Sequence, residues 1–127
     1  MRTTKERVLL VDDNPDITTV LKTGLHTHGI NVDAFNDPKQ VIANYTSGRY
    51  GCCVIDIRMP EMSGFELARW IWKREPEANV CFLSAFEIYK PEAEKMFPSL
   101  KTFCFVKKPI TPSELATHNR SHFVYAK

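Results

Sequence analysis

The chain has 127 residues, 43% hydrophobic and 25% charged, which is typical of one globular domain that needs no disulfide or metal staple. Its formal charge of +2 comes from basic residues scattered along the sequence, so we expect no nucleic-acid partner. The first seven residues are polar and no apolar run is long enough to span a bilayer, so we expect no signal peptide, no membrane contact and a cytoplasmic location.

Two strand and helix pairs are predicted in the first part of the chain. The apolar run 8–13 ends in two carboxylates, and the Asn-Pro pair that follows suits the cap and first turn of a helix. The buried stripe of this helix is expected to consist of Ile17, Val20, Leu21 and Leu25. A short strand over 31–35 precedes an Asp-Pro pair and a second helix that we expect to end near Gly48. The inner face of this second helix is predicted to carry Val41, Ile42 and Tyr45.

The same alternation continues to the C-terminal part of the chain. The predicted order is a strand ending at Asp56, a helix from a capping box at 63–66 to about Arg74, a strand over 79–85, a short helix over 91–97, a strand over 102–108 and a helix from a capping box at 111–114. Alternating strands and helices with short connections predict an α/β fold, a flavodoxin-like doubly wound five-stranded parallel sheet with helices on both faces. We expect residues 1–127 to form a single domain, with 119–127 unassigned.

The four cysteines all lie in strand-like apolar runs, so we expect them to be small core residues. Cys52 and Cys53 are neighbours on one strand and point to opposite faces, which prevents them from sharing a metal ion. A redox pair between Cys81 and Cys104 would require adjacent strands and is the less favoured alternative.

Five side chains of the predicted fold are expected to converge although they lie far apart in the sequence. Each stands where a predicted parallel strand ends, at the edge where open α/β sheets bind ligands. They are Asp12, Asp13, Asp56, Ser84 and Lys108. Three neighbouring carboxylates repel one another and suit a hard divalent cation such as Mg²⁺. Together with a lysine and a hydroxyl they make a site for a phosphoryl group.

Four motifs of this chain resemble the receiver domain of a two-component response regulator. They are VLLVDDNPDI, with an acidic pair; VIDIRMPEMSGFEL, with a phosphoacceptor strand and loop; FLSA, with a hydroxyl; and FVKKPI, with a lysine before a proline. The resemblance spans roughly residues 7–115. It implies that Asp56 accepts a phosphoryl group from a histidine kinase or phosphotransfer protein in a phosphorelay. The domain would then switch conformation to control a downstream partner, without turning over a separate substrate.

The resemblance also implies a role for each residue around Asp56. Mg²⁺ or Mn²⁺ would be bound by Asp13, Asp56 and the main-chain carbonyl of Arg58, with Asp12 acting through water. Ser84 and Lys108 would contact the phosphate, and strand alternation agrees that only one of Lys107 and Lys108 can reach the site. The other implied roles are Phe105 as the aromatic switch, Arg58 and Phe86 as residues that tune the phosphoryl lifetime, and Pro109 as a cis-proline.

The resemblance places the effector face on the fourth helix, fifth strand and fifth helix, with a possible homodimer on phosphorylation. Three alternatives remain open. An aspartyl-phosphate phosphatase is disfavoured because the acidic pair is adjacent and short loops leave no cap over a substrate. A flavin-binding module is disfavoured because the loop after the first strand is anionic where a phosphate would need amide donors. A pseudo-receiver that has lost the switch is disfavoured because all site residues are present.

Overall fold

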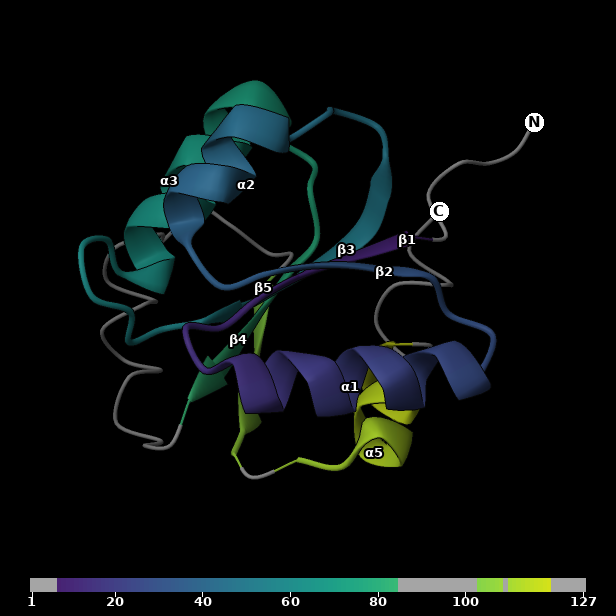
Figure 1. The fold of residues 1–127 in the computed structure, drawn as a ribbon. Helices are drawn as coiled ribbons and strands as arrows, with labels where there is room; N and C mark the ends of the chain where they lie inside the picture. The colour runs from purple at the N-terminus through teal and green to yellow at the C-terminus, as the bar shows by residue number, and fades with distance from the viewer. Residues whose placement is uncertain (1–6, 85–102, 109, 120–127) are drawn as a thin grey trace.

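The computed structural model describes residues 7–84, 103–108 and 110–119, which form one parallel sheet with helices on both faces (Figure 1). The elements are β1 (Arg7–Val11), α1 (Pro15–Thr27), β2 (Val32–Phe35), α2 (Pro38–Asn44), β3 (Tyr50–Asp56), α3 (Gly64–Arg74), β4 (Val80–Ser84), β5 (Phe103–Lys107) and α5 (Pro112–Asn119). The strand order is β2-β1-β3-β4-β5, and all pairs are parallel. This confirms the predicted doubly wound α/β fold.

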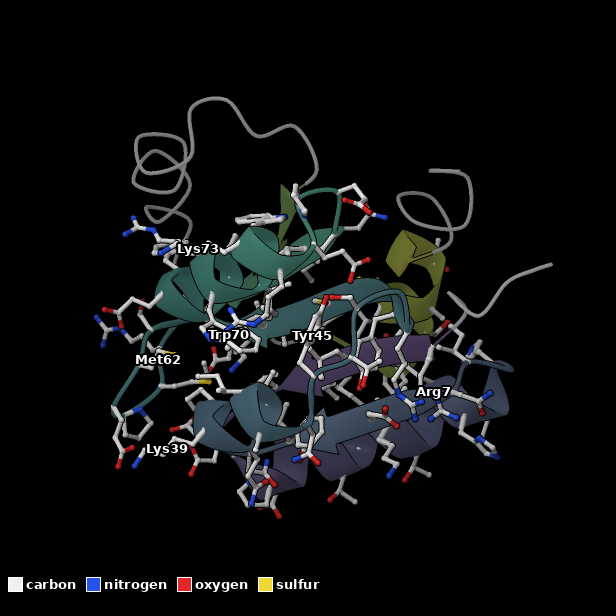
Figure 2. All side chains as sticks on the ribbon, turned by 90° about the horizontal axis from the view of Figure 1, so that it is seen from above. Arg7, Lys39, Tyr45, Met62, Trp70 and Lys73 are labelled. Carbon is white, nitrogen blue, oxygen red and sulfur yellow. The ribbon has the colours of Figure 1, made fainter. Side chains whose placement is uncertain are left out.

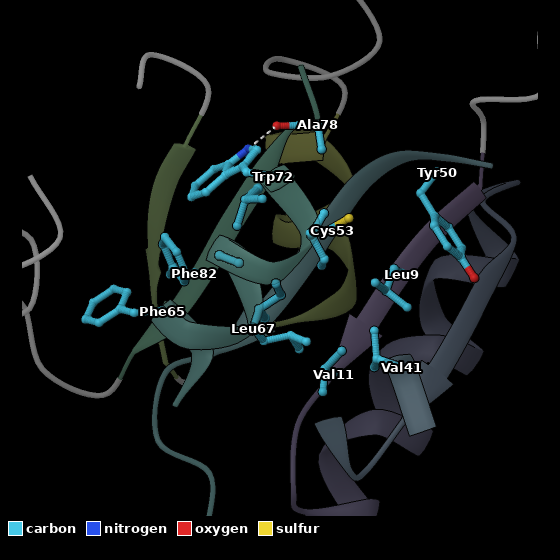
Figure 3. Close-up of a cluster of buried hydrophobic side chains, with 14 of the residues drawn as sticks. Leu9, Val11, Val41, Tyr50, Cys53, Phe65, Leu67, Trp72, Ala78 and Phe82 are labelled. Carbon is cyan, nitrogen blue, oxygen red and sulfur yellow. Dashed lines mark hydrogen bonds between the residues drawn. The ribbon is translucent and has the colours of Figure 1, made fainter. Parts of the chain in front are cut away.

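The sheet separates two hydrophobic cores, because successive residues of each strand point to opposite faces. α2 and α3 cover one face and α1 and α5 cover the other (Figure 1). Leu9 and Val11 of β1 belong to the first core, which Figure 3 shows, and Leu10 belongs to the second. The adjacent Cys53 and Cys52 divide in the same way, as predicted. The strands β1, β3 and β4 are thus buried on both faces, and their apolar runs in the sequence follow from this.

Side chains at the helix N-termini explain where the helices begin. Asn14 and Asp37 accept hydrogen bonds from main-chain amides two residues on, and proline follows each of them at the start of α1 and α2. The capping box predicted at Ser63 is complete, because the Glu66 amide donates to the serine hydroxyl and the Ser63 amide donates to the Glu66 carboxylate. The corresponding pair of bonds joins Thr111 and Glu114 at the start of α5.

Two details of the predicted helices are wrong. Val20 is 59% exposed, and the buried positions of α1 are Thr18, Leu21 and Leu25. The hydroxyl of Thr18 bonds the Pro15 carbonyl, so this polar residue can face inward where an apolar one was expected. The second helix ends at Asn44, before Gly48, because Tyr45 already has an extended backbone.

A polar network holds the α2 and α3 layer together. The Tyr45 hydroxyl donates to the buried Glu75 carboxylate at 2.6 Å, and the Gly48 amide donates to the same oxygen at 3.0 Å. The Tyr45 ring meets the Trp70 ring edge-on, with their centroids 5.8 Å apart (Figure 2). Trp72, the other tryptophan of α3, is buried and donates to the Ala78 carbonyl (Figure 3). The two bonds to Glu75 tie the end of α3 to the segment between α2 and β3.

A second polar network lies at the opposite end of the strands from the carboxyl edge. Asp33 of β2 accepts hydrogen bonds from Arg7, Arg49 and the Tyr50 hydroxyl, at 2.8, 2.9 and 2.8 Å. Burial pushes the pKa of Asp33 upward, but these donors and the two arginine charges outweigh it and lower the pKa below its usual value. Asp33 is therefore an ionised partner of the two arginines.

Three further predictions concern a cysteine pair, the fourth helix and membrane-spanning segments. β4 and β5 are adjacent with Cys81 opposite Cys104, but Cys81 is a thiol and not half of a disulfide. The helix predicted over 91–97 lies outside the described residues. No helix in the described ranges combines the length and the hydropathy that crossing a membrane requires.

Candidate functional site

The carboxyl edge of the sheet brings together the five residues predicted to converge. Asp12 follows β1 directly, Asp56 and Ser84 end β3 and β4, and Lys108 follows β5 directly. Together with Asp13 they line one cavity of about 250 Å³, which Asn14, Ile17, Ile57, Arg58 and Leu83 complete. The parallel register of β1, β3 and β4 aligns these strand ends at the centre of the sheet. The convergence predicted from the sequence is confirmed.

Lys108 is the cation at the centre of this cavity. Its ammonium nitrogen lies 2.7 Å from Asp12 Oδ2 and 3.1 Å from Asp56 Oδ1. The Lys108 main-chain amide donates to the Ser84 carbonyl at 2.8 Å, so the sheet ladder extends one residue past β5 and fixes the start of this side chain. The choice of Lys108 for the site is therefore supported by direct contacts.

Two buried carboxylates of the site, Asp12 and Asp56, share the single ammonium group of Lys108. Asp12 and Asp56 have side chains that are only 1% and 7% exposed, whereas Asp13 is exposed. Burial, and then the charge of Asp12, raise the pKa of Asp56 to about 6, although Lys108 opposes them. Burial lowers the pKa of Lys108, but its contacts with Asp12 and Asp56 outweigh this effect and the net shift is upward. One ammonium does not neutralise the acidic cluster.

Main-chain and amide donors fix the position of Asp12. The Asn14 amide donates to Asp12 Oδ1 at 3.0 Å, and the Asp12 amide donates to the Phe35 carbonyl at 3.1 Å. The side-chain amide of Asn36 donates to the Asp12 carbonyl at 2.7 Å. Sequence reasoning missed Asn36, because an Asn before an Asp-Pro pair is an ordinary loop residue and its distant partner depends on how two loops meet.

The N-terminus of α3 packs directly against the end of β3. The Gly64 amide donates to the Ile57 carbonyl at 2.8 Å. A β-carbon at position 64 would overlap the Asp56 carbonyl oxygen, so this close approach requires glycine. The capping box at Ser63 thus begins a helix that lies against the main chain of Asp56.

Other predicted site residues are placed only partly. Arg58 is exposed and lines the cavity. Phe105 lies in β5 opposite Phe82 of β4, and only its backbone is described. Phe86 and Pro109 lie outside the described residues, so their predicted roles as a tuning residue and a cis-proline are not tested.

The acidic cluster fits a hard divalent cation. Carboxylate oxygens of Asp12, Asp13 and Asp56 all lie within 4.8 Å of one another. Asp12 Oδ2 is buried, and among the described residues its partner is Lys108, an ion-pair contact of 2.7 Å without the geometry of a hydrogen bond, so this oxygen keeps acceptor capacity. Mg²⁺ prefers oxygen ligands, and the mutual repulsion of these carboxylates favours binding of a cation.

The fold and the site define a class of protein: a doubly wound α/β domain with an acidic, lysine-bearing cavity at the carboxyl edge of its central strands. The family model for the response regulator receiver domain matches residues 8–120. The chain therefore belongs to the response regulator receiver domain family and is a receiver domain of two-component signalling.

Curated relatives carry such a domain within longer chains. The transcriptional regulatory protein TrcR of Mycobacterium tuberculosis is 34% identical over 79 residues, which are 62% of this chain and 31% of TrcR. The sensor protein EvgS of Escherichia coli K12 is 31% identical over 114 residues, which are 90% of this chain and 9% of EvgS. The chain thus spans about a third or less of these two relatives.

Solved structures show the same fold. The response regulator TrrA of Thermotoga maritima, crystallised with Mg²⁺-BeF, superposes with a TM-score of 0.79 at 28% identity, covering 93% of this chain and 99% of that one. The chemotaxis protein CheY4 of Vibrio cholerae gives a TM-score of 0.82 at 21% identity, covering 94% and 99% of the two chains. The family assignment decides against the phosphatase and flavin alternatives.

Proposed function

We propose that Asp56 is the phosphoacceptor of this receiver domain and that Mg²⁺ assists the transfer. The observation that carries the proposal is the placement of Asp56, a buried carboxylate at the end of β3 that shares the ammonium group of Lys108 with Asp12. Arg58, Ser84 and Lys108 line the cavity in front of it. Asp12 stands at the end of β1, lines the same cavity and lies 2.7 Å from Lys108, so the choice of Asp56 over Asp12 is supported by the phosphoacceptor motif that Asp56 occupies in this family and not by the lysine contact.

The proposed reaction is an in-line phosphoryl transfer. An oxygen of the Asp56 carboxylate attacks the phosphorus of a phosphohistidine, a P–O bond forms as the P–N bond breaks, and the departing imidazole nitrogen takes up a proton. The product is an acyl phosphate on Asp56. Charge on the equatorial phosphoryl oxygens must be compensated during transfer, and Lys108 supplies a fixed positive charge at the required end of the cavity.

The cation would be held by Asp13, Asp56 and the main-chain carbonyl of Arg58, with Asp12 acting through water. When bound, it supplies positive charge that lets carboxylate and phosphoryl oxygens approach each other. Lys108 would move from Asp12 toward the new phosphoryl group, because that group carries more charge than a carboxylate. Ser84 would donate a hydrogen bond to a phosphoryl oxygen from the end of β4.

The phosphoryl group would change the domain's interactions with its partners. Phosphorylation adds charge that favours whichever arrangement of Ser84 and Lys108 contacts it, so it shifts the population between two conformations. β5 and α5 are the described parts of the face that we propose for an effector or a second copy of the chain. A histidine kinase or phosphotransfer protein would act upstream.

One experiment tests the assignment of Asp56. The protein is incubated with acetyl phosphate and MgCl₂, and intact mass is followed for the wild type, Asp56→Asn and Asp33→Asn. We expect a single phosphoryl adduct on the wild type and on Asp33→Asn, and none on Asp56→Asn. Asp33 is a suitable control because it is a paired carboxylate outside the cavity. No adduct on the wild type, as in a pseudo-receiver, or equal adducts on all three proteins, would refute the proposal.

A further inference from the structure

The side-chain amide nitrogen of Asn36 joins the turn that carries Asp13 to the loop between β2 and α2. This loop belongs to none of the four receiver-domain motifs. Asn36 lies between β2 and α2, and its Nδ2 donates to the Asp12 carbonyl at 2.7 Å and to the Thr18 hydroxyl oxygen at 2.9 Å. Both amide hydrogens are thereby used. The Thr18 hydroxyl donates its own hydrogen to the Pro15 carbonyl, so it acts as an acceptor toward Asn36, and the nitrogen must be the atom that faces it.

The two acceptors bracket a short segment of chain. Asp12 directly follows β1 and Thr18 is a buried residue in the first turn of α1, so the hydrogen bonds of Asn36 join the two ends of the turn 13–17. This turn carries Asp13, the exposed member of the acidic cluster. The amide of Asn14 at the same turn holds Asp12 Oδ1. The positions of both acidic residues therefore depend on where Asn36 holds the turn.

We propose that Asn36 is a positioning residue that keeps Asp12 and Asp13 spaced for a divalent cation. The inference rests on the proposed metal site. Carboxylates within 4.8 Å repel one another, and the turn that carries Asp13 can relieve this repulsion by moving outward. Two hydrogen bonds from Asn36 oppose that movement before any cation arrives, so less ordering is left to be done on binding.

The consequence is a loss of metal affinity when the amide is removed. Partners that orient metal-binding side chains alter affinity by about 10- to 100-fold in established metal sites. Asn36 acts through the main chain and a turn, so we expect Asn36→Ala to weaken Mg²⁺ binding by about tenfold, at the low end of that range. Thr18→Val removes one of the two acceptors and leaves the Asp12 bond, so a smaller loss is expected.

The first measurement is binding of Mg²⁺ by calorimetry to the wild type, Asn36→Ala, Thr18→Val and the double variant. The double variant should bind about as weakly as Asn36→Ala, because Asn36→Ala already removes the contact with Thr18, and the Thr18 bond to the Pro15 carbonyl that Thr18→Val also removes lies within the first turn of α1. Asn79→Ala is the matched control: it deletes a side-chain amide bond to the Gly51 carbonyl at the other end of the strands and should leave affinity unchanged. Thermal unfolding in EDTA confirms that each variant folds, which we expect because Asn36 is exposed.

The second measurement distinguishes a loss of Mg²⁺ affinity from a general loss of activity. The rate of adduct formation from acetyl phosphate is recorded as a function of Mg²⁺ concentration. For Asn36→Ala, the half-saturating concentration should rise about tenfold while the rate at saturation stays within about twofold of the wild type. A lower saturating rate with an unchanged half-saturation, or an equal loss in Asn79→Ala, overturns the inference.

The two proposals fail in different ways. If the wild type neither binds Mg²⁺ nor forms an adduct, the proposed function is wrong. If the wild type does both and Asn36→Ala binds Mg²⁺ as tightly, only the role of Asn36 is wrong.

Discussion

Asp56 is a carboxylate held in a place that disfavours its charge. Its side chain is 7% exposed, Asp12 lies in the same cluster, and one lysine serves both residues. Such an arrangement costs stability in the metal-free protein and prepares the site for positive charge. Buried groups whose pKa is shifted in this way are typical of functional sites, where local stability is given up for chemistry.

The substitution Asp56→Asn is therefore expected to stabilise the metal-free domain. The folded pKa, raised to about 6, lies above the unfolded value, so the folded state binds the proton more tightly and ionised Asp56 destabilises it. A neutral amide should raise the free energy of unfolding by about 3 kcal/mol at neutral pH.

The pH dependence of the stability difference between Asp56→Asn and the wild type tests whether the charge of Asp56 is its cause. As the pH falls from about 7 to about 4, wild-type Asp56 becomes protonated and the difference between the two proteins should disappear. Urea unfolding in EDTA at both pH values measures it, and taking the difference between the proteins cancels groups such as Asp33 that titrate in both. A variant less stable than the wild type at neutral pH would show that the ion pair with Lys108 outweighs the burial of charge.

Among the elements, the junction of β3 and α3 links the position of α3 to Asp56, the proposed phosphoacceptor. Gly64→Ala would place a methyl group against the Asp56 carbonyl oxygen and the Ile55 side chain, so α3 must shift. We expect a loss of about 1–3 kcal/mol in unfolding free energy and slower adduct formation from acetyl phosphate. Ser63→Ala is the control: it loses the cap, at a cost of about 1 kcal/mol, without this overlap. Equal adduct rates in the two variants would contradict the steric argument.

The elements differ in how far the sequence determines them. The strands, the caps at Asn14, Asp37 and Ser63 and the convergence of Asp12, Asp56 and Lys108 follow from local patterns and from the topology of a parallel sheet. The exposure of Val20 and the role of Asn36 do not, because each depends on contacts between segments distant in the sequence.

Among the residues that the structure describes, charged networks lie at both ends of the strands, and the one at the carboxyl edge is the less balanced. Asp33 is matched by Arg7, Arg49 and a tyrosine hydroxyl, whereas Asp12 and Asp56 at the carboxyl edge share the ammonium group of Lys108. A ligand that binds only the folded state stabilises it by mass action. A divalent cation should therefore stabilise this domain through the unbalanced end alone.

The melting temperature of the wild type is expected to rise with the logarithm of Mg²⁺ concentration, and the added stability should reach about 2.7 kcal/mol at a hundredfold excess over Kd. Asp13→Asn should lose most of this response, because it removes a proposed ligand. Asp33→Asn should be less stable than the wild type yet gain as much from Mg²⁺, because it disturbs only the balanced network. Scanning calorimetry against NaCl of matched ionic strength isolates the specific effect. An equal rise in Asp13→Asn, or with NaCl, would mean that Mg²⁺ acts by general screening of charge and not at the acidic cluster.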